Sequence, residues 1–347
     1  MMQEKLQGVN LDGWLMLEPW VTPELFSQTS TLDPISLANK LGKDAYCELV
    51  QKHVQSFITE ADFKQIADRG YNAVRLPIPW HIFGEDGPLA GFHASYIEYV
   101  DKAFDWASKY KLNILLTIAL APGAEKSCHS FRMKTDFTPA RRRALIQIAG
   151  MLAARYVGRT AFFGVEPLNE VVTMRRVGLS VEPGLPLSHL RNLYRDLYAE
   201  IRRCAGNGPV IVFSDAGRHA NWKYFMAAKR YERVWLDTHL YRPGTISAAF
   251  GNASASQLLS ASRQALAQAH TSGLPVMVGE WSAAIATATK GMTPEGRVAQ
   301  ERLFVAQQIN LLSVCPAWFF QTWKTSNRLS AWDARVALAN FERAMLK

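Results

Sequence analysis

Short apolar runs rich in β-branched residues alternate with amphipathic stretches along this 347-residue chain, and this alternation constrains the fold more than any other feature. Near-continuous apolar runs such as LNILLTIA at 112–119 indicate strands buried on both faces of a sheet. We expect strands at 7–11, 72–78, 112–119, 161–168, 209–214, 234–240, 275–279 and 317–322. We expect helices at 60–68, 96–110, 139–156, 188–204, 221–230, 254–271, 294–312 and 333–346.

Strands that alternate with helices predict parallel strands joined by right-handed crossovers. Eight such units predict an α/β fold of the closed (β/α)8 type, a TIM barrel, as a single domain over residues 1–347. A doubly wound open sheet is the alternative, and it would need a glycine-rich phosphate-binding loop after the first strand. Asp12-Gly13-Trp14 stands there instead, so the barrel is favoured.

The composition excludes a disordered chain, because 48% of the residues are hydrophobic and only 20% are charged. Ten tryptophans fit either a large core or a cleft that binds sugars or bases. The 39 Lys and Arg against 30 Asp and Glu give a formal charge of +9, which raises the possibility of nucleic-acid binding. These residues are scattered and no nucleic-acid motif accompanies them, so we expect no nucleic-acid partner.

The cysteines form no C-x-x-C pair, which disfavours a structural zinc site and a dense disulfide framework; they are Cys47, Cys128, Cys204 and Cys315. No apolar run reaches 18 residues, so we expect no membrane association. The first residues lack the apolar stretch of a signal peptide. We therefore expect a cytoplasmic protein, with a secreted mature form as the open alternative.

Two glutamates stand at the ends of predicted strands, where barrel enzymes carry their catalytic groups. Glu170 follows the fourth strand and Glu280 follows the seventh, and these strands face each other across a barrel. Paired carboxylates suit glycosidic bond cleavage. A metal hydrolase would need several His and Asp ligands at these ends, whereas His239 is the histidine found there. We therefore predict a glycosidase that uses neither a metal ion nor a cofactor.

Sugar rings present apolar faces and polar rims, which aromatic and polar side chains contact respectively. The residues near strand ends that we predict to bind substrate are Glu18, Arg75, Asn169, His239, Tyr241, Trp281, Gln321 and Trp323.

The opening segment 8–26, GVNLDGWLMLEPWVTPELF, resembles the GVNLGGW…LEPW.TPSLF pattern of exo-1,3-β-glucanases of glycoside hydrolase family 5. The likeness continues at 41–44, 60–83, 164–170 (GVEPLNE), 237–241 (DTHLY), 278–284 (VGEWSAA) and 318–325 (WFFQTWKT). The matches keep their order and span nearly the whole chain.

This resemblance implies that Glu170 is the acid/base and Glu280 the nucleophile of a reaction that retains the anomeric configuration. Their carboxyl groups should then lie about 5 Å apart. Glu170 would need a raised pKa, while Glu280 would stay ionised above Arg75.

The resemblance also assigns groups that hold the sugar. Asn169 corresponds to the residue that hydrogen-bonds the 2-hydroxyl. His239 and Tyr241 correspond to a pair on the sixth strand, with Tyr241 contacting the nucleophile. Glu18 corresponds to a carboxylate that binds the terminal sugar in an exo-type pocket.

Three departures from the family pattern bear on the sugar-binding site. Ala119-Leu120 stands where the family has His-Gly, and Val171 follows Glu170 where the family has Pro. Gln321 takes the first position of a W-x-W pattern and Trp323 keeps the second. These changes imply a sugar, linkage or leaving group different from that of a plain exo-1,3-glucanase.

We therefore predict a retaining β-glycosidase that acts on a β-glucoside or a short β-glucan oligosaccharide. Two alternatives remain open: a transglycosylase that makes or remodels β-glucan, and a catalytically silent carbohydrate-binding barrel. The oligomeric state stays open.

Overall fold

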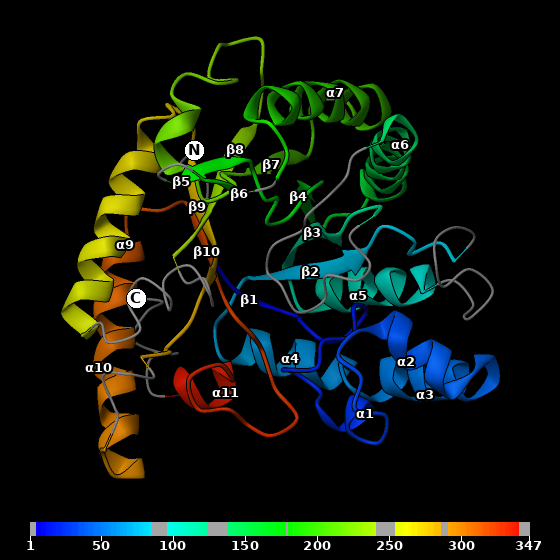
Figure 1. Cartoon of the computed structure of the whole chain (residues 1–347), viewed down its shortest axis with the longest axis vertical. Helices are drawn as coiled ribbons and strands as arrows, with labels where there is room; N and C mark the ends of the chain where they lie inside the picture. Colours follow the sequence, from blue (N-terminus) through cyan, green and yellow to red (C-terminus); the bar gives the residue numbers. More distant parts are fainter. Residues whose placement is uncertain are drawn as a thin grey trace.

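Eight parallel strands close into a barrel in the order β1-β10-β9-β8-β7-β4-β3-β2, so the first and last strands are neighbours (Figure 1). The computed structural model describes residues 5–84, 96–123, 138–177, 180–182, 184–240, 254–285 and 291–339. The strands are β1 (Leu6–Asn10), β2 (Ala73–Pro79), β3 (Asn113–Leu120), β4 (Phe162–Glu166), β7 (Val210–Ser214), β8 (Val234–His239), β9 (Val276–Trp281) and β10 (Ala317–Phe320). The predicted (β/α)8 barrel is confirmed, and every predicted strand overlaps one of these.

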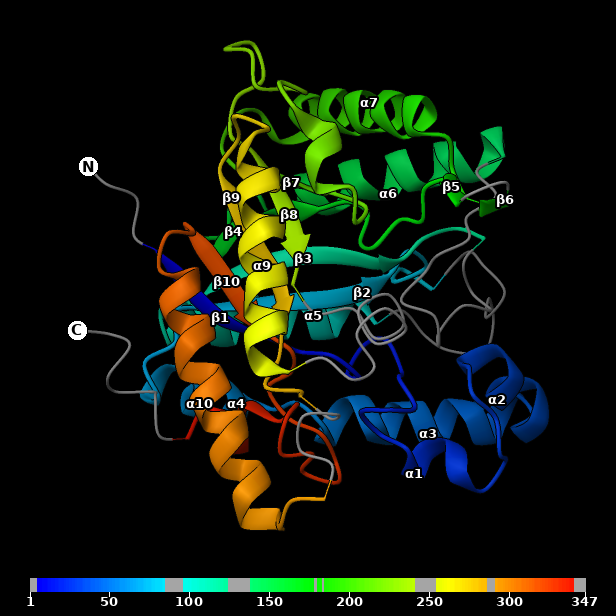
Figure 2. The ribbon, with the colours of Figure 1, turned by 60° about the vertical axis from the view of Figure 1, so that its left-hand side comes forward.

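Helices cover the outside of the barrel, with α9 and α10 along one side, as Figures 1 and 2 show from two directions. The helices are α1 (Glu24–Ser27), α2 (Pro34–Leu41), α3 (Lys43–Ser56), α4 (Glu60–Asp68), α5 (Ile97–Lys109), α6 (Pro139–Tyr156), α7 (Leu187–Ala205), the 3-10 helix η1 (His219–Trp222), α9 (Ala255–His270), α10 (Pro294–Leu312) and α11 (Ala334–Ala337). A short antiparallel hairpin, β5 (Arg175–Val177) and β6 (Ser180–Glu182), follows β4.

Capping residues explain why several helices begin where the sequence predicts. Thr138 accepts a hydrogen bond from the backbone N–H of Arg141 at 3.3 Å, and Pro139 follows it in the first turn of α6. Thr293 caps α10 in the same way, through the N–H of Gly296 at 3.2 Å. Both helices start at the predicted residue.

The predicted helix at 221–230 is wrong. The chain forms only η1 there, because Trp222 is buried and donates its indole N–H to the Asp215 carbonyl at 2.7 Å. Tyr224 and Met226 then take positive φ angles of 57° and 56°, which a helix cannot accommodate.

Three helices between β1 and α4 were not predicted: the short α1, and α2 and α3. Asp33 caps α2 by accepting from Ser36 N at 2.8 Å, and Gly42 separates α2 from α3 with a φ of 80°. The predicted helix at 333–346 is shorter, because α11 ends at Ala337; residues 340–347 lie outside the described part.

The barrel interior changes from apolar to polar along the strands. Its apolar layer consists of Leu6, Ala73, Leu115, Phe163, Val210, Val212, Trp235, Met277, Ala317 and Phe319. Side chains two residues apart point to the same side of a strand. Two residues beyond Ala73 stands Arg75, and beyond Trp235 stand Asp237 and then His239, all buried. The carboxyl end of the barrel is therefore lined with charged groups.

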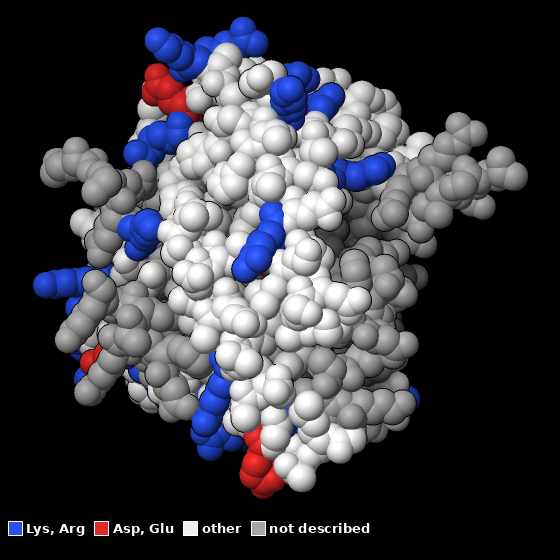
Figure 3. All heavy atoms as spheres, turned by 90° about the vertical axis from the view of Figure 1, so that its left-hand side faces the viewer, with Lys and Arg blue, Asp and Glu red and all other residues white. Residues whose placement is uncertain are grey.

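On the face that carries α9 and α10, the Lys and Arg side chains lie in small separate groups (Figure 3). This distribution matches the scattered basic residues of the sequence. Among the described residues no helix combines the length and the apolar character that crossing a membrane requires. The cytoplasmic location stays a prediction.

Strand packing leads to a prediction at Gly164 in β4. A Cβ there would lie 2.2 Å from the Val210 carbonyl oxygen of the paired strand. We expect Gly164→Ala to destabilise the fold by about 1–3 kcal/mol through overpacking. Thermal unfolding followed by circular dichroism measures this. Gly158→Ala, where a Cβ meets nothing within 4 Å, is the control; equal melting temperatures for the two variants would contradict the prediction.

Candidate active site

The guanidinium of Arg75 lies at the centre of the polar layer and is fully buried. Its Nε and Nη2 contact Glu166 Oε2 at 2.9 and 2.8 Å. Nη1 donates to Asn10 Oδ1 at 2.8 Å and to Glu280 Oε1 at 3.1 Å. Nη2 also donates to Asn169 Oδ1 at 2.9 Å. One cation therefore connects strands β1, β2, β4 and β9, together with the loop that follows β4.

Glu280 lies in β9, with its carboxylate surrounded by donors. Besides Arg75, Asn169 Nδ2 lies 3.4 Å from Oε1 and His239 Nδ1 lies 3.4 Å from Oε2. Burial raises the pKa of Glu280; the positive charge of His239 opposes this, and the nearby Glu170 adds to it. The expectation that Arg75 lies beneath this carboxylate agrees with the geometry.

Glu170 follows β4 and approaches Glu280 through a shared histidine. His239 Nδ1 lies 2.8 Å from Glu170 Oε1, and its Nε2 lies 2.9 Å from Asp237 Oδ2. Burial alone would lower the pKa of His239, but Glu280 and Asp237 raise it well above its usual value. A protonated imidazole donates from both nitrogens. Oxygen atoms of Glu170 and Glu280 lie within 4.8 Å of each other.

Two groups of side chains have the donor atoms that a metal ion would need. Glu170, His239 and Glu280 form one, and Glu166, Asp237 and His239 form the other, each with its atoms within 4.8 Å. Both depend on His239, whose two nitrogens face carboxylates, and a ligating nitrogen must be unprotonated. The geometry suits proton sharing between acids better than metal ligation.

A second pair of carboxyl groups stands on the loop after β1. Glu18 is buried and accepts a hydrogen bond from the Trp20 indole N–H at 2.5 Å. Asp12 is also buried, and it lies close enough to Glu280 for their charges to interact. Burial raises the pKa of Asp12 to about 7 and raises the pKa of Glu18 well above its usual value.

Sequence reasoning predicted Glu18 but missed Asp12, Glu166 and Asp237 as members of the site. Asp237 lies inside β8, whereas Glu166 is the last residue of β4 but falls within the longer strand predicted at 161–168. Residues two positions apart on a strand point to the same side. Asp237 could therefore have been found as the residue two positions before the predicted site residue His239. Asp12 stands two residues after β1. It could therefore have been predicted from the tendency of barrel enzymes to carry site residues at strand ends.

Trp281 and Trp323, which the sequence predicts to bind substrate, make their described contacts away from the carboxylates. Trp281 follows Glu280 and therefore points to the opposite side of β9, where it packs edge-on against Trp318 and Phe320 at centroid distances of 5.4 and 5.0 Å. Trp323 donates its indole N–H to Asp62 on α4 at 2.9 Å. Both rings belong to the layer between barrel and helices.

Gln321 directly follows β10 and is 2% exposed. Its Oε1 has no hydrogen-bond partner among the described residues. Its backbone N–H donates to the Trp281 carbonyl at 2.9 Å, which fixes it beside β9. Tyr241 lies outside the described residues, so its predicted contact with Glu280 stays a prediction.

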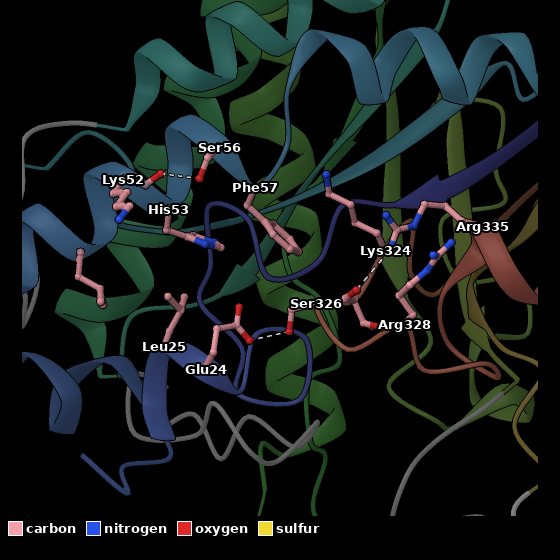
Figure 4. A pocket seen from close by; sticks show the side chains of 12 residues that line it. Glu24, Leu25, Lys52, His53, Ser56, Phe57, Lys324, Ser326, Arg328 and Arg335 are labelled. Atoms are coloured by element: carbon pink, nitrogen blue, oxygen red, sulfur yellow. Dashed lines mark hydrogen bonds between the residues drawn. The ribbon is translucent and has the colours of Figure 1, made fainter. Parts of the chain in front are cut away.

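A cavity of about 630 Å3 lies apart from these carboxylates, between α1, α3 and the segment after β10 (Figure 4). His53 lines it and contacts the Gly13 carbonyl at 2.7 Å, so α3 supports the loop after β1 from behind. Lys324 also lines it and pairs with Asp62 at 2.7 Å. The cavity thus lies behind the loop that carries Asp12.

Two glutamates lie close together at the carboxyl end of a (β/α)8 barrel. This arrangement is typical of one class of protein, the glycoside hydrolases that use paired carboxylates. The family model described as "Cellulase (glycosyl hydrolase family 5)" matches residues 40–311. The chain belongs to glycosyl hydrolase family 5, and it is a glycoside hydrolase.

Relatives and solved structures agree with this assignment. The chain is 27% identical over 379 aligned positions to "Probable glucan 1,3-beta-glucosidase A" of Emericella nidulans, covering 97% of this chain and 89% of the relative. It is 25% identical to "Glucan 1,3-beta-glucosidase" of Schwanniomyces occidentalis, with 95% and 85% coverage. The rutinosidase from Aspergillus niger has the same fold, with a TM-score of 0.76, 17% identity and 98% of each chain covered.

The central position of Arg75 leads to a stability prediction. Arg75→Met leaves buried carboxylates without their cation, and we expect it to lower the free energy of unfolding by about 3–5 kcal/mol. Urea unfolding measures this. Arg155→Met, which breaks a partly exposed pair with Asp101, is the control and should cost about 1 kcal/mol or less. Similar losses in both variants would show that Arg75 is not central.

The raised pKa of Glu280 leads to a pH prediction. The resemblance implies that Glu280 is the nucleophile, and a nucleophile attacks as the carboxylate. In that role kcat/KM on an activated aryl glycoside rises as Glu280 ionises, and this acidic limb of the pH profile should lie above the ordinary glutamate pKa of 4.5. His239 lowers the pKa of Glu280, so His239→Gln should move the limb to higher pH. His189→Gln, at an exposed position on α7, should leave it in place. An unmoved limb in His239→Gln would contradict this.

Proposed function

We propose that this chain is a retaining β-glycosidase that removes terminal β-linked glucosyl units from a short oligosaccharide or a β-glucoside. The observation that carries the proposal is the approach of Glu170 and Glu280, whose oxygens lie within 4.8 Å of each other. Retaining enzymes hold their carboxyl groups about 5–5.5 Å apart, whereas inverting enzymes need roughly 6.5–9.5 Å to admit a water molecule.

The reaction has two displacement steps. Glu170 first donates its proton to the glycosidic oxygen while a Glu280 oxygen attacks the anomeric carbon, so that the bond to the leaving group breaks and a glycosyl ester forms. Glu170, now ionised, then takes a proton from water as the water oxygen attacks the same carbon. The ester bond breaks, and Glu280 returns to its ionised form. Two inversions give net retention.

The neighbouring groups prepare both glutamates for these roles. Arg75 and Asn169 direct hydrogen bonds to Glu280 Oε1 and leave Oε2 as the oxygen nearer to His239. His239 contacts both carboxylates through Nδ1, so it sets their separation. Fixed donors of this kind need little reorganisation during reaction.

The proposed substrate class rests on the relatives and on the loop after β1. Two relatives carry names that describe glucan 1,3-beta-glucosidases. Buried Glu18 and half-buried Trp20 form a carboxylate–indole pair near Glu280, which suits the closed end of an exo-type pocket. Because groups from β1 to β10 build this pocket, we propose that residues 1–347 act as one catalytic domain.

A covalent trap tests the proposal. We expect a 2-deoxy-2-fluoro β-glucoside with an activated leaving group to add one glycosyl mass, located on Glu280 by peptide mapping, because the fluorine slows hydrolysis of the ester. In Glu170→Gln the trap should still form, while hydrolysis of laminaribiose falls by about 10²–10⁴-fold for lack of the acid. A silent carbohydrate-binding barrel would form no adduct with any glycosyl fluoride.

A further inference from the structure

Asp12 stands in the wall of the proposed pocket, at a position where the family pattern GVNLGGW has glycine. Its backbone N–H donates to Thr322 Oγ1 at 3.1 Å, and the same hydroxyl donates to the Asn10 carbonyl at 2.8 Å. The loop after β1 is thereby joined to the segment after β10. This connection places Asp12 close to Gln321, the residue before Thr322.

Two buried oxygens of this wall lack hydrogen-bond partners among the described residues. Asp12 is 4% exposed and its Oδ2 is unpartnered; Gln321 is 2% exposed and its Oε1 is unpartnered. Buried acceptors are normally satisfied, and exceptions call for an explanation. A bound ligand that offers several donors would satisfy both. Because both unpartnered atoms are acceptors, such a ligand would have to supply hydrogen-bond donors.

In the described part of the chain no cation forms an ion pair with the two acids of this wall, although the charges of Arg75 and His239 reach Asp12 from a longer distance. Arg75 is already engaged by Glu166 and Glu280, and His239 lies between Glu170 and Asp237. Neither forms a hydrogen bond with Asp12 or with Glu18 in the described structure. A buried carboxylate is costly unless a cation or several donors compensate it.

Resting on the function proposed above, we propose that the terminal-sugar subsite takes an amino sugar in its ammonium form, such as a β-linked glucosaminyl unit, and that Asp12 selects it. The hydroxyls of a neutral glucosyl unit would satisfy the acceptors but leave the charge in place. An ammonium group brings three donors and the opposite charge. The sugar would then donate hydrogen bonds to Asp12, Glu18 and Gln321.

The raised pKa values of the two acids agree with the lack of a cation in direct contact, since Arg75 and His239 offset only part of the rise at Asp12. Burial raises the pKa of Asp12 to about 7, and the charge of Glu280 adds to this. Burial and the neighbouring Asp12 raise the pKa of Glu18. An ammonium group beside them would favour both ionised forms and lower both pKa values.

The test compares kcat/KM for two matched substrates, 4-nitrophenyl β-glucosaminide and 4-nitrophenyl β-glucoside. We expect the wild type to prefer the glucosaminide. Asp12→Asn keeps the shape but removes the charge, and we expect it to lower kcat/KM for the glucosaminide by about 10–100-fold, the effect of one charge-assisted hydrogen bond, and to lower kcat/KM for the glucoside by a clearly smaller factor. Asp12→Gly, with the residue of the family pattern, should shift the preference in the same direction.

Asp101→Asn, at a partly exposed aspartate on α5, is the matched control and should leave the preference unchanged. Circular dichroism establishes that each variant is folded. A wild-type preference for the glucoside, or an equal loss on both substrates in Asp12→Asn and Asp12→Gly, would overturn the inference while leaving the glycosidase intact. If the wild type cleaves neither substrate and Glu280 forms no adduct, the proposed function fails, and the inference fails with it.

Discussion

The buried guanidinium of Arg75 is the interaction on which the carboxyl end of the barrel depends. Carboxylates brought together without solvent would repel one another and take up protons. A single cation with five fixed N–H groups holds Glu166 and Glu280 in place and also orients Asn10 and Asn169. The acidic residues can therefore be concentrated at one end of the barrel, above the apolar layer.

The fold was largely predictable because its strands carry a strong local signal. The buried runs in β3 and β7 are almost entirely apolar, and proline with a capping threonine marks the start of α6. The segment 221–230 failed because a local pattern does not show that Trp222 is needed in the core. The helix α3 was missed although its buried residues Tyr46, Val50 and Val54 recur at the spacing of a helix face.

The candidate site was predictable where chemistry follows strand ends and less so within strands. Glu170, Glu280, His239 and Arg75 come together as the barrel rule implies. Trp281 was misassigned because adjacent residues on a strand point in opposite directions, so it cannot share the face of Glu280. Aromatic richness at strand ends therefore reflects, in part, the packing of helices against the barrel.

The hydroxyl of Thr322 joins two loops whose contacting residues lie 310 positions apart in the sequence. The wall containing Asp12 and Gln321 is thus completed only when β10 inserts between β1 and β9. Contacts of such separation form late in folding, since the entropy of closing the long loop must be overcome first. During synthesis the growing chain would carry its acidic groups without a finished pocket, and sugar binding would begin only after the last strand has emerged.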